Sequence, residues 1–242
     1  MLYLYGMPNN YFQFKQFRIE QDKTAMKVCT DSCLFGAWVH PSPSTKNILD
    51  IGTGTGLLSL MLAQKTMAYI DAIEIDNDAF EQAKTNIASS KWNEKIELLH
   101  GDVRTYDFKK SYDLIICNPP FYINEQASVD EGEQIAKHSS KLSLPELLNT
   151  MKKLVSEDGA VALLLPYYRK EECIFLALEQ GFFLEQLIDI QQSPKHSFFR
   201  FAGIFTTHQP TAPKSSTIAI KNEDDKYSEA FTELLKPYYL NL

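Results

Sequence analysis

The chain has 242 residues, of which 44% are hydrophobic and 23% are charged, as is typical of a globular enzyme with a sizeable core. Its formal net charge of −7 lowers the expectation of a nucleic-acid partner but leaves it open, since local basic side chains are enough to contact phosphates. The sequence has neither an apolar run long enough to cross a bilayer nor a signal-peptide pattern, so we expect a cytoplasmic protein without membrane contact.

The four cysteines, Cys29, Cys33, Cys117 and Cys173, do not follow a metal-binding or redox pattern. No pair has the C-x-x-C spacing, and no histidine stands at the offset of a zinc ligand. We therefore expect free thiols that act as small buried side chains in a reducing compartment, and no metal site.

Between residues 47 and about 207, short runs rich in β-branched residues alternate with helical patterns. This alternation predicts an α/β fold: a mostly parallel seven-stranded sheet with an antiparallel last strand and helices on both faces. The expected strands are 47–51, 69–75, 96–99, 113–117, 159–165, 182–190 and 198–206. The expected helices are 57–63, 79–89, 145–157 and 170–180, and Asn77 or Asp78 is expected to cap the second of them.

Two regions flank this core, which we place at residues 45–208 of a single domain covering residues 1–242. Residues 1–44 form an N-terminal decoration that is aromatic at its start and helical near 30–38. Residues 209–242 form a C-terminal extension with a short strand at 217–220 and an aromatic tail. Within the core, the polar stretch 124–141 is expected to be a long loop over the C-terminal edge of the sheet.

A glycine-rich turn, Asp50-Ile51-Gly52-Thr53-Gly54-Thr55-Gly56, lies between the first expected strand and the first core helix. Open α/β sheets bind ligands at this point, and glycines let the backbone approach a ligand closely. The spacing is G-x-G-x-G, which differs from the G-x-G-x-x-G of dinucleotide-binding folds. The turn alone is also compatible with an ordinary tight connection.

Two acidic residues at neighbouring strand ends make a nucleoside cofactor the better interpretation of this turn. Glu74 ends the second strand, where a carboxylate can accept hydrogen bonds from ribose hydroxyls. Asp102 follows the third strand and can bind the exocyclic amine of adenine. We place Ile75 and Val103, which follow these residues directly, in the same site. The carboxylates of Asp50 and Glu74 suit a positively charged sulfonium better than an anionic pyrophosphate.

The tetrapeptide Asn118-Pro119-Pro120-Phe121 follows the fourth expected strand, so it leaves the same edge of the sheet. The Asn118 side-chain carbonyl and the Pro119 main-chain carbonyl can both accept hydrogen bonds from one planar amino group, which orients its nitrogen toward a methyl donor. The two prolines stiffen the segment, and Phe121 can stack on the flat ring that carries the amine, with Tyr122 as a second wall. This arrangement predicts methyl transfer by proximity and alignment, without a metal.

With these residues, the chain resembles the class I methyltransferases, and within them the Asn-Pro-Pro-aromatic group that modifies conjugated nitrogens. Further segments are similar to the bacterial enzymes that methylate N6 of the adenine 3′ of the anticodon in a valine tRNA. Those segments cover nearly the full length: Phe14-Lys15-Gln16-Phe17, residues 25–31 with Gly36-Ala37-Trp38, residues 50–62, Ile70-Asp71-Ala72, residues 118–122, Tyr227-Ser228-Glu229-Ala230 and Tyr239-Leu240. The family often has Gly at the position of Cys29 and Tyr at the position of Phe121.

The resemblance implies a Rossmann-like fold and S-adenosylmethionine as the methyl donor. It implies that Gly52, Gly54, Gly56, Glu74 and Asp102 bind this donor. Thr30 and Asp31 would then lie near its methionine end, although either residue can equally serve as a helix cap. The implied substrate is tRNA, and we expect a monomer.

An anticodon loop is single-stranded, so its bases can be splayed out without breaking a duplex. We expect Lys137 and Lys141 of the long loop to contact substrate phosphates. The weaker candidates for RNA contact are His138, Arg169, Lys170, Lys195, His196, Arg200, Phe198, Phe199, Tyr238 and Tyr239. Each of them singly is better explained as a solvated charge or a core aromatic.

Four other functions are compatible with parts of this pattern. A protein glutamine-N5 methyltransferase and a guanine-N2 rRNA methyltransferase would use the same tetrapeptide. The glutamine enzymes usually carry a separate N-terminal helical domain, for which the roughly 45 residues before the first core strand are short. A nicotinamide oxidoreductase lacks support without the G-x-G-x-x-G spacing. A non-catalytic binding module would have no need for Asn118.

Overall fold

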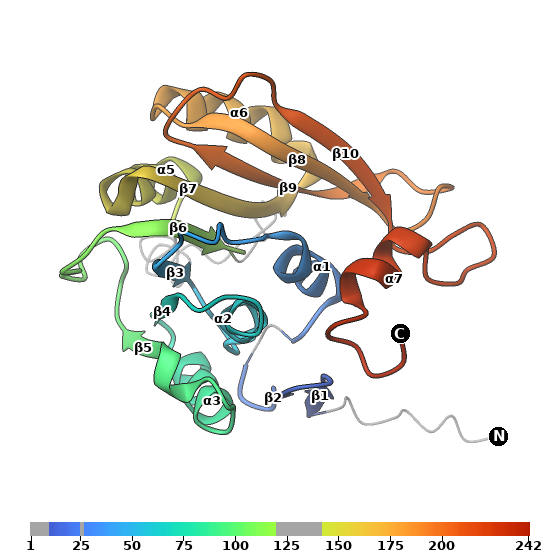
Figure 1. The fold of residues 1–242 in the computed structure, drawn as a ribbon, viewed down its shortest axis with the longest axis horizontal. Coiled ribbons are helices and arrows are strands. Elements are labelled where there is room, and N and C mark those ends of the chain that lie inside the picture. Colours follow the sequence, from blue (N-terminus) through green and yellow to red (C-terminus); the bar gives the residue numbers. More distant parts are fainter. Residues whose placement is uncertain (1–9, 25–26, 120–141) are drawn as a thin grey trace, which may run out of the picture.

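The computed structural model of the chain describes residues 10–24, 27–119 and 142–242, and a mixed sheet forms the centre of this part (Figure 1). Its eight strands are β3 (Asn47–Ile51), β4 (Tyr69–Glu74), β5 (Ile96–His100), β6 (Tyr112–Cys117), β7 (Val155–Pro166), β8 (Phe183–Gln191), β9 (Phe198–Thr206) and β10 (Lys214–Ala219). They lie in the order β10-β8-β9-β7-β6-β3-β4-β5. The N-terminal segment adds a separate two-stranded hairpin, β1 (Tyr11–Gln13) and β2 (Arg18–Glu20).

Strand directions confirm the predicted mostly parallel sheet. β3 pairs in parallel with β4 and β6, and β9 runs antiparallel to both of its neighbours, β7 and β8. The predicted seven strands are all present, with β9 as the reversed last one. The predicted number of strands was one too low, because β10 of the C-terminal extension joins the sheet and pairs in parallel with β8. An open edge of β8 would otherwise leave a row of unpaired backbone groups, which β10 satisfies.

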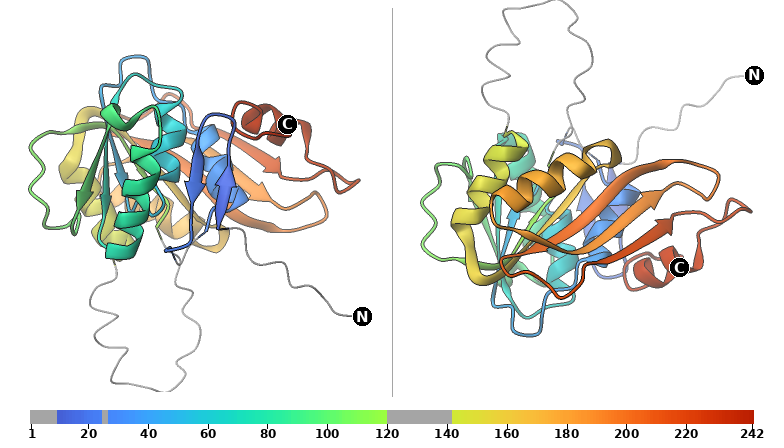
Figure 2. Two further views of the ribbon diagram at one scale, coloured as in Figure 1. Left: turned by 90° about the horizontal axis from the view of Figure 1, so that it is seen from below. Right: turned by 90° about the horizontal axis from the view of Figure 1, so that it is seen from above.

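Helices cover both faces of the sheet, as predicted. The helices are α1 (Thr30–Trp38), α2 (Leu57–Ala63), α3 (Asn77–Ala88), α5 (Leu144–Leu154), α6 (Lys170–Glu179) and α7 (Glu229–Leu235), with short 3-10 helices η1 (Asn93–Lys95) and η2 (Tyr167–Arg169). α1, α2, α3 and α7 share one hydrophobic core, and α5 and α6 share the other. Figure 2 shows the face with α2 and α3 from below and the face with α5 and α6 from above. Successive strand residues alternate between these cores: Leu114 and Ile116 face the first, and Ile115 and Cys117 the second.

Two helix boundaries differ from the prediction by two residues or more. Asp76, rather than Asn77 or Asp78, caps α3, because its extended backbone lets the carboxylate accept a hydrogen bond from Ala79 N at 2.9 Å. The helix expected to end at residue 157 ends at Leu154, since Val155 already pairs with Tyr112 of β6. At the other end of that helix, Ser143 and Glu146 form a capping box.

The N-terminal hairpin joins the core through α3 and the C-terminal tail. The side chain of Asn86 on α3 accepts a hydrogen bond from Glu20 N at 2.8 Å and donates one to Glu20 O at 2.9 Å. Phe14 pairs with Tyr239, and Lys15 N donates to Tyr238 O at 2.7 Å. The two flanking regions therefore meet each other on the face of the sheet that carries α1 and α2.

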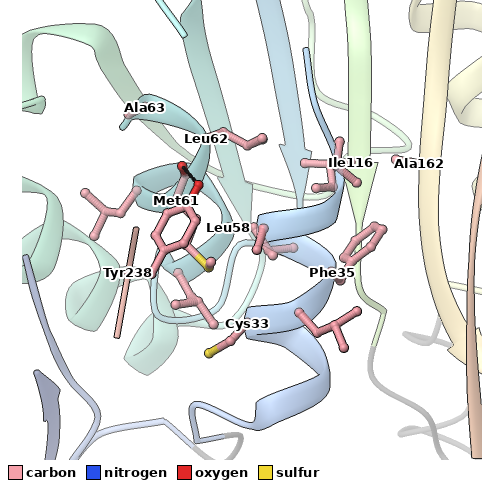
Figure 3. Packing of buried hydrophobic residues seen from close by; sticks show 14 of the residues in the cluster. Cys33, Phe35, Leu58, Met61, Leu62, Ala63, Ile116, Ala162 and Tyr238 are labelled. Carbon is pink, nitrogen blue, oxygen red and sulfur yellow. Dashed lines mark hydrogen bonds between the residues drawn. The ribbon is translucent and has the colours of Figure 1, made fainter. Parts of the chain in front are cut away.

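Helix α1 is held tightly between α2 and the sheet (Figure 3). Phe35 packs toward Ile116 and Ala162 of the sheet, and Cys33 lies on the side of Met61 and Tyr238. At Gly36 the two helices approach so closely that an added Cβ would lie 2.7 Å from Met61 Sδ. These contacts fix the position of α1 relative to α2 and the sheet.

Lys65 holds the C-terminal end of this helix. Its ammonium group donates hydrogen bonds to the carbonyl oxygens of Gly36 at 2.7 Å and Ala37 at 2.9 Å, which the helix itself leaves unpaired. Burial lowers the pKa of Lys65 to about 7.

None of the helices in the described part of the chain combines the length and the apolar character needed to span a bilayer.

Candidate active site

The candidate residues on the strand ends gather at one edge of the sheet, as the sequence predicts. The register places Ile51 opposite both Ile73 and Cys117, so the glycine turn, Glu74 and Asn118 all follow neighbouring, level positions. β5 extends the row, because Glu74 pairs with His100, two residues before Asp102. The order β6-β3-β4-β5 therefore puts the glycine turn between Asn118 on one side and the two acidic residues on the other.

The three glycines of the turn adopt left-handed backbone conformations, with φ of 67° at Gly52, 59° at Gly54 and 82° at Gly56. Nothing described lies within 4 Å of the position that a Cβ of Gly52 would take, and the nearest atom to a Cβ of Gly54 is 4.0 Å away. At Gly56 a Cβ would instead contact Ile87 of α3 at 3.5 Å. The first two glycines thus border open space, and the third serves packing against α3.

Asp50 ends its strand as a fully buried carboxylate with two different oxygens. Oδ2 accepts hydrogen bonds from Thr53 Oγ1 at 2.6 Å, from Ser59 Oγ at 2.7 Å and from Ser59 N at 3.1 Å. Oδ1 is buried and has no hydrogen-bond partner among the described residues. Burial raises the pKa of Asp50 from 3.8 to about 6, against the opposing effect of its hydrogen bonds.

Glu74 is buried beside the glycine turn and holds the turn in place. Its Oε2 accepts a hydrogen bond from Gly54 N at 2.9 Å, and its Oε1 accepts from Ile75 N and Asp76 N, both at 2.9 Å. A carboxylate offers about four lone-pair positions, so about one remains for a ribose hydroxyl. Ile75 is 54% exposed, an apolar side chain at this edge that a flat ring can cover.

Asp102 is engaged by a neighbouring arginine that the sequence analysis did not single out. Arg104 donates from Nε to both oxygens of Asp102, at 3.0 and 2.9 Å, and its backbone N donates to Oδ1 at 2.9 Å. These contacts lower the pKa of Asp102, so it stays ionised. Val103 is buried in the core beneath it. The adenine-binding roles of Asp102 and Val103 stay predictions.

Thr30 and Asp31 form the first turn of α1, and neither caps it. Cys29 occupies the cap position without a side-chain capping bond, so the capping alternative is wrong. Asp31 accepts hydrogen bonds from Ser32 N at 3.1 Å and from Arg200 Nε at 2.9 Å. The interaction with Arg200 of β9 explains why the Asp31 carboxylate is tolerated in a nearly buried position.

Asn118 stands directly after β6 with its side-chain amide in a defined environment. Nδ2 donates a hydrogen bond to Ser32 Oγ at 2.8 Å. Oδ1 is buried, and no described residue donates a hydrogen bond to it. Pro119 follows as a half-buried residue. Leaving a carbonyl oxygen buried and unpaired costs about 1–3 kcal/mol, which points to a functional reason for it.

Comparisons with known proteins agree with this geometry. Residues 33–145 match the family model described as the methyltransferase small domain. A tRNA1(Val) (adenine(37)-N6)-methyltransferase from Parabacteroides distasonis is 40% identical over 238 residues, which are 98% of this chain and 100% of that protein. Proteins of the same name from Cytophaga hutchinsonii and Tolumonas auensis are 38% and 37% identical, each over 98% of this chain and over 100% and 99% of their own lengths. The chain belongs to this methyltransferase family.

Solved structures support the fold of the methyltransferase. A predicted O-methyltransferase from Agrobacterium tumefaciens superposes with a TM-score of 0.65 at 17% identity, covering 88% of this chain and 100% of the other. A methyltransferase from Pyrococcus furiosus gives a TM-score of 0.59 at 22% identity, covering 79% of this chain and 89% of the other. At these identities the likeness concerns the Rossmann-like fold alone, which confirms the predicted fold class.

The described residues of the methyltransferase fit S-adenosylmethionine. Open space beside Gly52 and Gly54 leaves room for a ligand against the backbone. The carboxylates of Asp50 and Glu74 both contribute to the raised pKa of the buried Cys117 thiol, so both lie near the end of β6. Two negative charges in this region suit a cationic group. The binding roles of Gly52, Gly54, Gly56, Glu74, Ile75, Asp102, Val103, Thr30 and Asp31 remain predictions at the level of single contacts.

Five of the predicted residues lie outside the described part of the chain. They are Pro120, Phe121, Tyr122, Lys137 and Lys141, and His138 lies there too. The expected loop over the sheet edge, residues 124–141, lies entirely outside the described residues as well.

The weaker RNA candidates turn out to have partners within the methyltransferase. Arg169 pairs with Glu172, Lys170 with Asp189, and Lys195 donates to the Glu223 carbonyl. The charges of Arg169 and Lys170 are therefore partly neutralised by the protein itself, which weakens the expectation of phosphate contacts there, whereas Lys195 contacts only an uncharged carbonyl.

The aromatic candidates divide into two groups. Tyr238 and Tyr239 are 3% and 9% exposed, so they are core aromatics, the explanation preferred from the sequence, and they offer no stacking surface. They instead close the core beside α1 and α7. Phe198 is half-buried against Tyr167, with ring centroids 5.2 Å apart. Tyr168, which the sequence analysis did not single out, is 70% exposed just beyond the end of β7.

The cysteines are free, as expected, and three of them are buried. Burial raises the pKa of Cys33, Cys117 and Cys173, so these thiols stay protonated. Cys29 is only half-buried and lies within 2.9 Å of Ser32 Oγ. Across residues 10–24, 27–119 and 142–242, no group of three His, Cys, Asp or Glu side chains is placed to hold a metal ion.

Sequence reasoning missed Ser32 and Arg104. Arg104 stands two residues from Asp102, a spacing at which a guanidinium can reach a carboxylate. Its positive charge close to Asp102 in the sequence could therefore have predicted the ion pair. Ser32 is separated from Asn118 by 86 residues, and only the fold brings the two together.

Proposed function

We propose that the protein transfers a methyl group from S-adenosylmethionine to N6 of adenine 37 in tRNA1(Val). The observation that carries this proposal is the buried Oδ1 of Asn118, which lacks a partner among the described residues and stands beside the glycine turn. Relatives that match the chain over nearly its full length have this activity in their names. A planar amine is the group that such an acceptor and a following carbonyl can orient together.

S-adenosylmethionine, when bound, supplies a methyl group on a positively charged sulfur. Gly52 and Gly54 leave space for it against the backbone, and Glu74, already fixed by three backbone amides, offers its remaining acceptor position to the ribose. Asp50 and Glu74 favour the positive charge electrostatically. Asp102 and Ile75 would receive the adenine ring, by hydrogen bonding and by apolar contact.

Asn118 and Pro119 hold the amine that is methylated. Two carbonyl oxygens that accept its two hydrogens fix the nitrogen and draw its lone pair out of conjugation with the ring. Held in this way, the nitrogen would be aligned with the methyl group of the bound donor, and one of its two N–H protons would leave for solvent on transfer. Pro119 and Pro120 keep the segment stiff, so little reorganisation is needed. The chain thus contributes alignment rather than a strong base or a metal.

Phe121 and Tyr122 complete the proposed base pocket by stacking, and Lys137 and Lys141 contact the phosphates of the anticodon loop. An unpaired loop suits such a pocket, because its bases can leave the stack at low cost. Arg169 and Lys170, two of the weaker candidates, are paired with acidic side chains of the protein, so the proposal assigns the phosphate contacts to the two loop lysines. RNA binding should therefore weaken when Lys141 is reversed to Glu, while S-adenosylmethionine binding stays unchanged.

The experiment that tests the function is methyl transfer from labelled S-adenosylmethionine to total RNA of a bacterium whose own copy of the gene is deleted. Deletion keeps the target site unmodified, and nucleoside analysis identifies the product. A single labelled N6-methyladenosine, traced to tRNA1(Val), supports the proposal. Label in N2-methylguanosine of rRNA, or in glutamine of a protein fraction, overturns the substrate and favours one of the two related activities.

We also propose that residues 1–242 act as a single domain and as a cytoplasmic monomer without a metal. The contacts of the N-terminal hairpin with α3 and with the C-terminal tail favour one cooperative unit. Light scattering on the active enzyme tests the monomer, and full activity in EDTA is the expected result for a metal-independent reaction.

A further inference from the structure

The amide of Asn118 must point in one direction for the proposed reaction, because its two ends behave oppositely. The carbonyl oxygen accepts hydrogen bonds, and the NH₂ group can only donate them. An amine substrate brings hydrogens, so it requires the oxygen. A rotation of the side chain by half a turn would present the NH₂ group instead and repel the substrate. Something in the protein has to prevent that rotation.

Ser32 is the group in contact with the other end of this amide. Its hydroxyl oxygen accepts the hydrogen bond from Asn118 Nδ2 at 2.8 Å, and the residue is only 4% exposed. A serine hydroxyl can both accept and donate, so Ser32 alone would allow either orientation of the amide. The direction has to come from what lies behind Ser32.

On the side away from Asn118, Ser32 is next to the thiol of Cys29, and that thiol is next to the carboxylate of Asp31. Cys29 Sγ lies 2.9 Å from Ser32 Oγ. Burial, and then the charge of Asp31 and a hydrogen bond to it, raise the pKa of the Cys29 thiol to about 11, so the thiol keeps its proton. The Asp31 carboxylate, which follows Cys29 by two residues, itself accepts a hydrogen bond from Arg200 Nε at 2.9 Å.

These constraints propagate in one direction. A Cys29 thiol that directs its hydrogen at Asp31, as the raised pKa implies, leaves its sulfur to accept from the Ser32 hydroxyl. The hydroxyl then has only lone pairs to offer to Asn118, which must turn its NH₂ group toward Ser32. The remaining end of the amide, Oδ1, is the one without a partner among the described residues.

We propose that Ser32 is a positioning residue that fixes the amide of Asn118 with its oxygen toward the substrate amine, and that Asp31 sets the direction through Cys29. The proposal deepens the proposed function and rests on it, since it concerns the orientation of an acceptor for a planar amine. Helix α1 is a suitable mount, because its close packing against α2 and the sheet keeps Ser32 at a fixed distance from β6 (Figure 3).

The central test is Ser32→Ala in the full-length enzyme, with kcat and KM measured separately for S-adenosylmethionine and for RNA. Loss of the hydrogen bond leaves the NH₂ group without its partner on α1, so the reversed orientation, with NH₂ toward the substrate, should dominate and kcat should fall about tenfold. Neither KM should change appreciably, since Ser32 contacts neither substrate. Ser32→Thr, which keeps the hydroxyl, should restore most of kcat.

Two further variants separate orientation from structure. Cys29→Ala should lower kcat about threefold, because it frees the Ser32 hydroxyl to donate to Asn118 while leaving their contact intact. Ser90→Ala is the matched control: Ser90 is a half-buried serine that bonds the Ile87 carbonyl at the end of α3, and its loss should leave kcat unchanged. Equal thermal stability of the Ser32 and Ser90 variants excludes a folding defect.

A direct readout does not depend on activity. In the ¹⁵N-labelled protein without ligands, the side-chain NH₂ protons of Asn118 should exchange slowly with solvent, and Ser32→Ala should abolish this protection. An unchanged kcat in Ser32→Ala, or equally fast exchange in both proteins, overturns the inference. If the wild type instead methylates guanine or glutamine, the proposed substrate fails, and the same comparison of kcat on that amine still tests Ser32.

Discussion

The two halves of the candidate site treat their polar groups differently. At the ends of β4 and β5, the carboxylates of Glu74 and Asp102 are engaged by groups of the same chain: three backbone amides for one and Arg104 for the other. At the ends of β3 and β6, Asp50 and Asn118 each bury one oxygen for which the described residues provide no partner.

This difference separates binding from chemistry. A carboxylate that is already hydrogen-bonded is a rigid frame, and a ligand that adds one contact to it needs no rearrangement. A buried acceptor without a donor costs the folded protein about 1–3 kcal/mol until a substrate supplies the donor. The half with satisfied groups therefore suits the adenosine part of the methyl donor, and the half with unsatisfied groups suits the site where the amine and the methyl group meet.

The largest effect is expected from Asn118→Ala, which removes the unsatisfied acceptor altogether. The rate of methyl transfer should fall by about 10² to 10³, the usual loss when one preorganised polar group at a reaction centre is deleted. Affinity for S-adenosylmethionine should stay within about twofold, since Asn118 faces the amine. Single-turnover kinetics and calorimetry check the two halves of this statement, and a variant that keeps more than a tenth of the wild-type rate would contradict the comparison.

The next effect concerns stability and comes from the buried carboxylate of Asp50. Its pKa is raised from 3.8 to about 6, so the folded protein binds a proton there more readily than the unfolded chain does. Stability should therefore fall as the pH rises from about 4 to 6, by as much as about 3 kcal/mol, and this contribution should be constant above pH 6.

Urea unfolding of the wild type and of Asp50→Asn at a series of pH values isolates this group. The free energy of unfolding of the variant, relative to the wild type, should rise between pH 4 and pH 6, because the amide does not ionise. Parallel curves for the two proteins would mean that the Asp50 carboxylate has the ordinary pKa of a well-partnered group. The contrast between the two halves of the site would then be lost.

A third effect distinguishes the glycines of the turn. Gly52→Ala and Gly56→Ala both force a Cβ onto a left-handed backbone, and each should lower stability by about 1–2 kcal/mol. They differ in what the Cβ meets: open space at Gly52 and Ile87 of α3 at Gly56. Binding of S-adenosylmethionine should weaken at least about tenfold in the Gly52 variant through steric exclusion, and far less in the Gly56 variant. Equal affinities in the two variants would show that the open space beside Gly52 is not where the donor lies.

The sequence was sufficient to place these groups at one edge because parallel strands end together. Asp50, Glu74 and Asn118 each follow a recognisable run of apolar residues, and the strand order then brings them side by side. The fold class and most element boundaries follow from the same alternation. The failures were local: Asp76 competes with its neighbours for the cap of α3, and the pairing of Val155 with Tyr112 ends α5 early.

What the sequence does not contain is the state of each group at that edge. Whether the Asn118 oxygen is free depends on Ser32, which lies 86 residues away and reaches it only because α1 packs against α2. The burial of Tyr238 and Tyr239 likewise depends on contacts with the N-terminal hairpin. Long-range partners of this kind leave no periodic or spacing signal.

The smallest effect tests Asp102, where the prediction from sequence and the observed partner pull in different directions. Arg104 makes four hydrogen bonds to the carboxylate, two to each oxygen, so the amine of adenine has to take the place of one of them or share its acceptor. Asp102→Ala should therefore weaken S-adenosylmethionine binding about tenfold, the worth of one hydrogen bond to a charged acceptor.

Arg104→Ala is the matched control for this carboxylate. It leaves the oxygens in place and removes the contacts that keep the pKa of Asp102 low, so the donor should bind within about threefold of the wild type at neutral pH. Calorimetric titration of both variants decides between two roles for Asp102. If its removal leaves the affinity unchanged, the carboxylate serves Arg104 and the loop after β5, and the adenine ring must be recognised by Ile75 and the backbone instead.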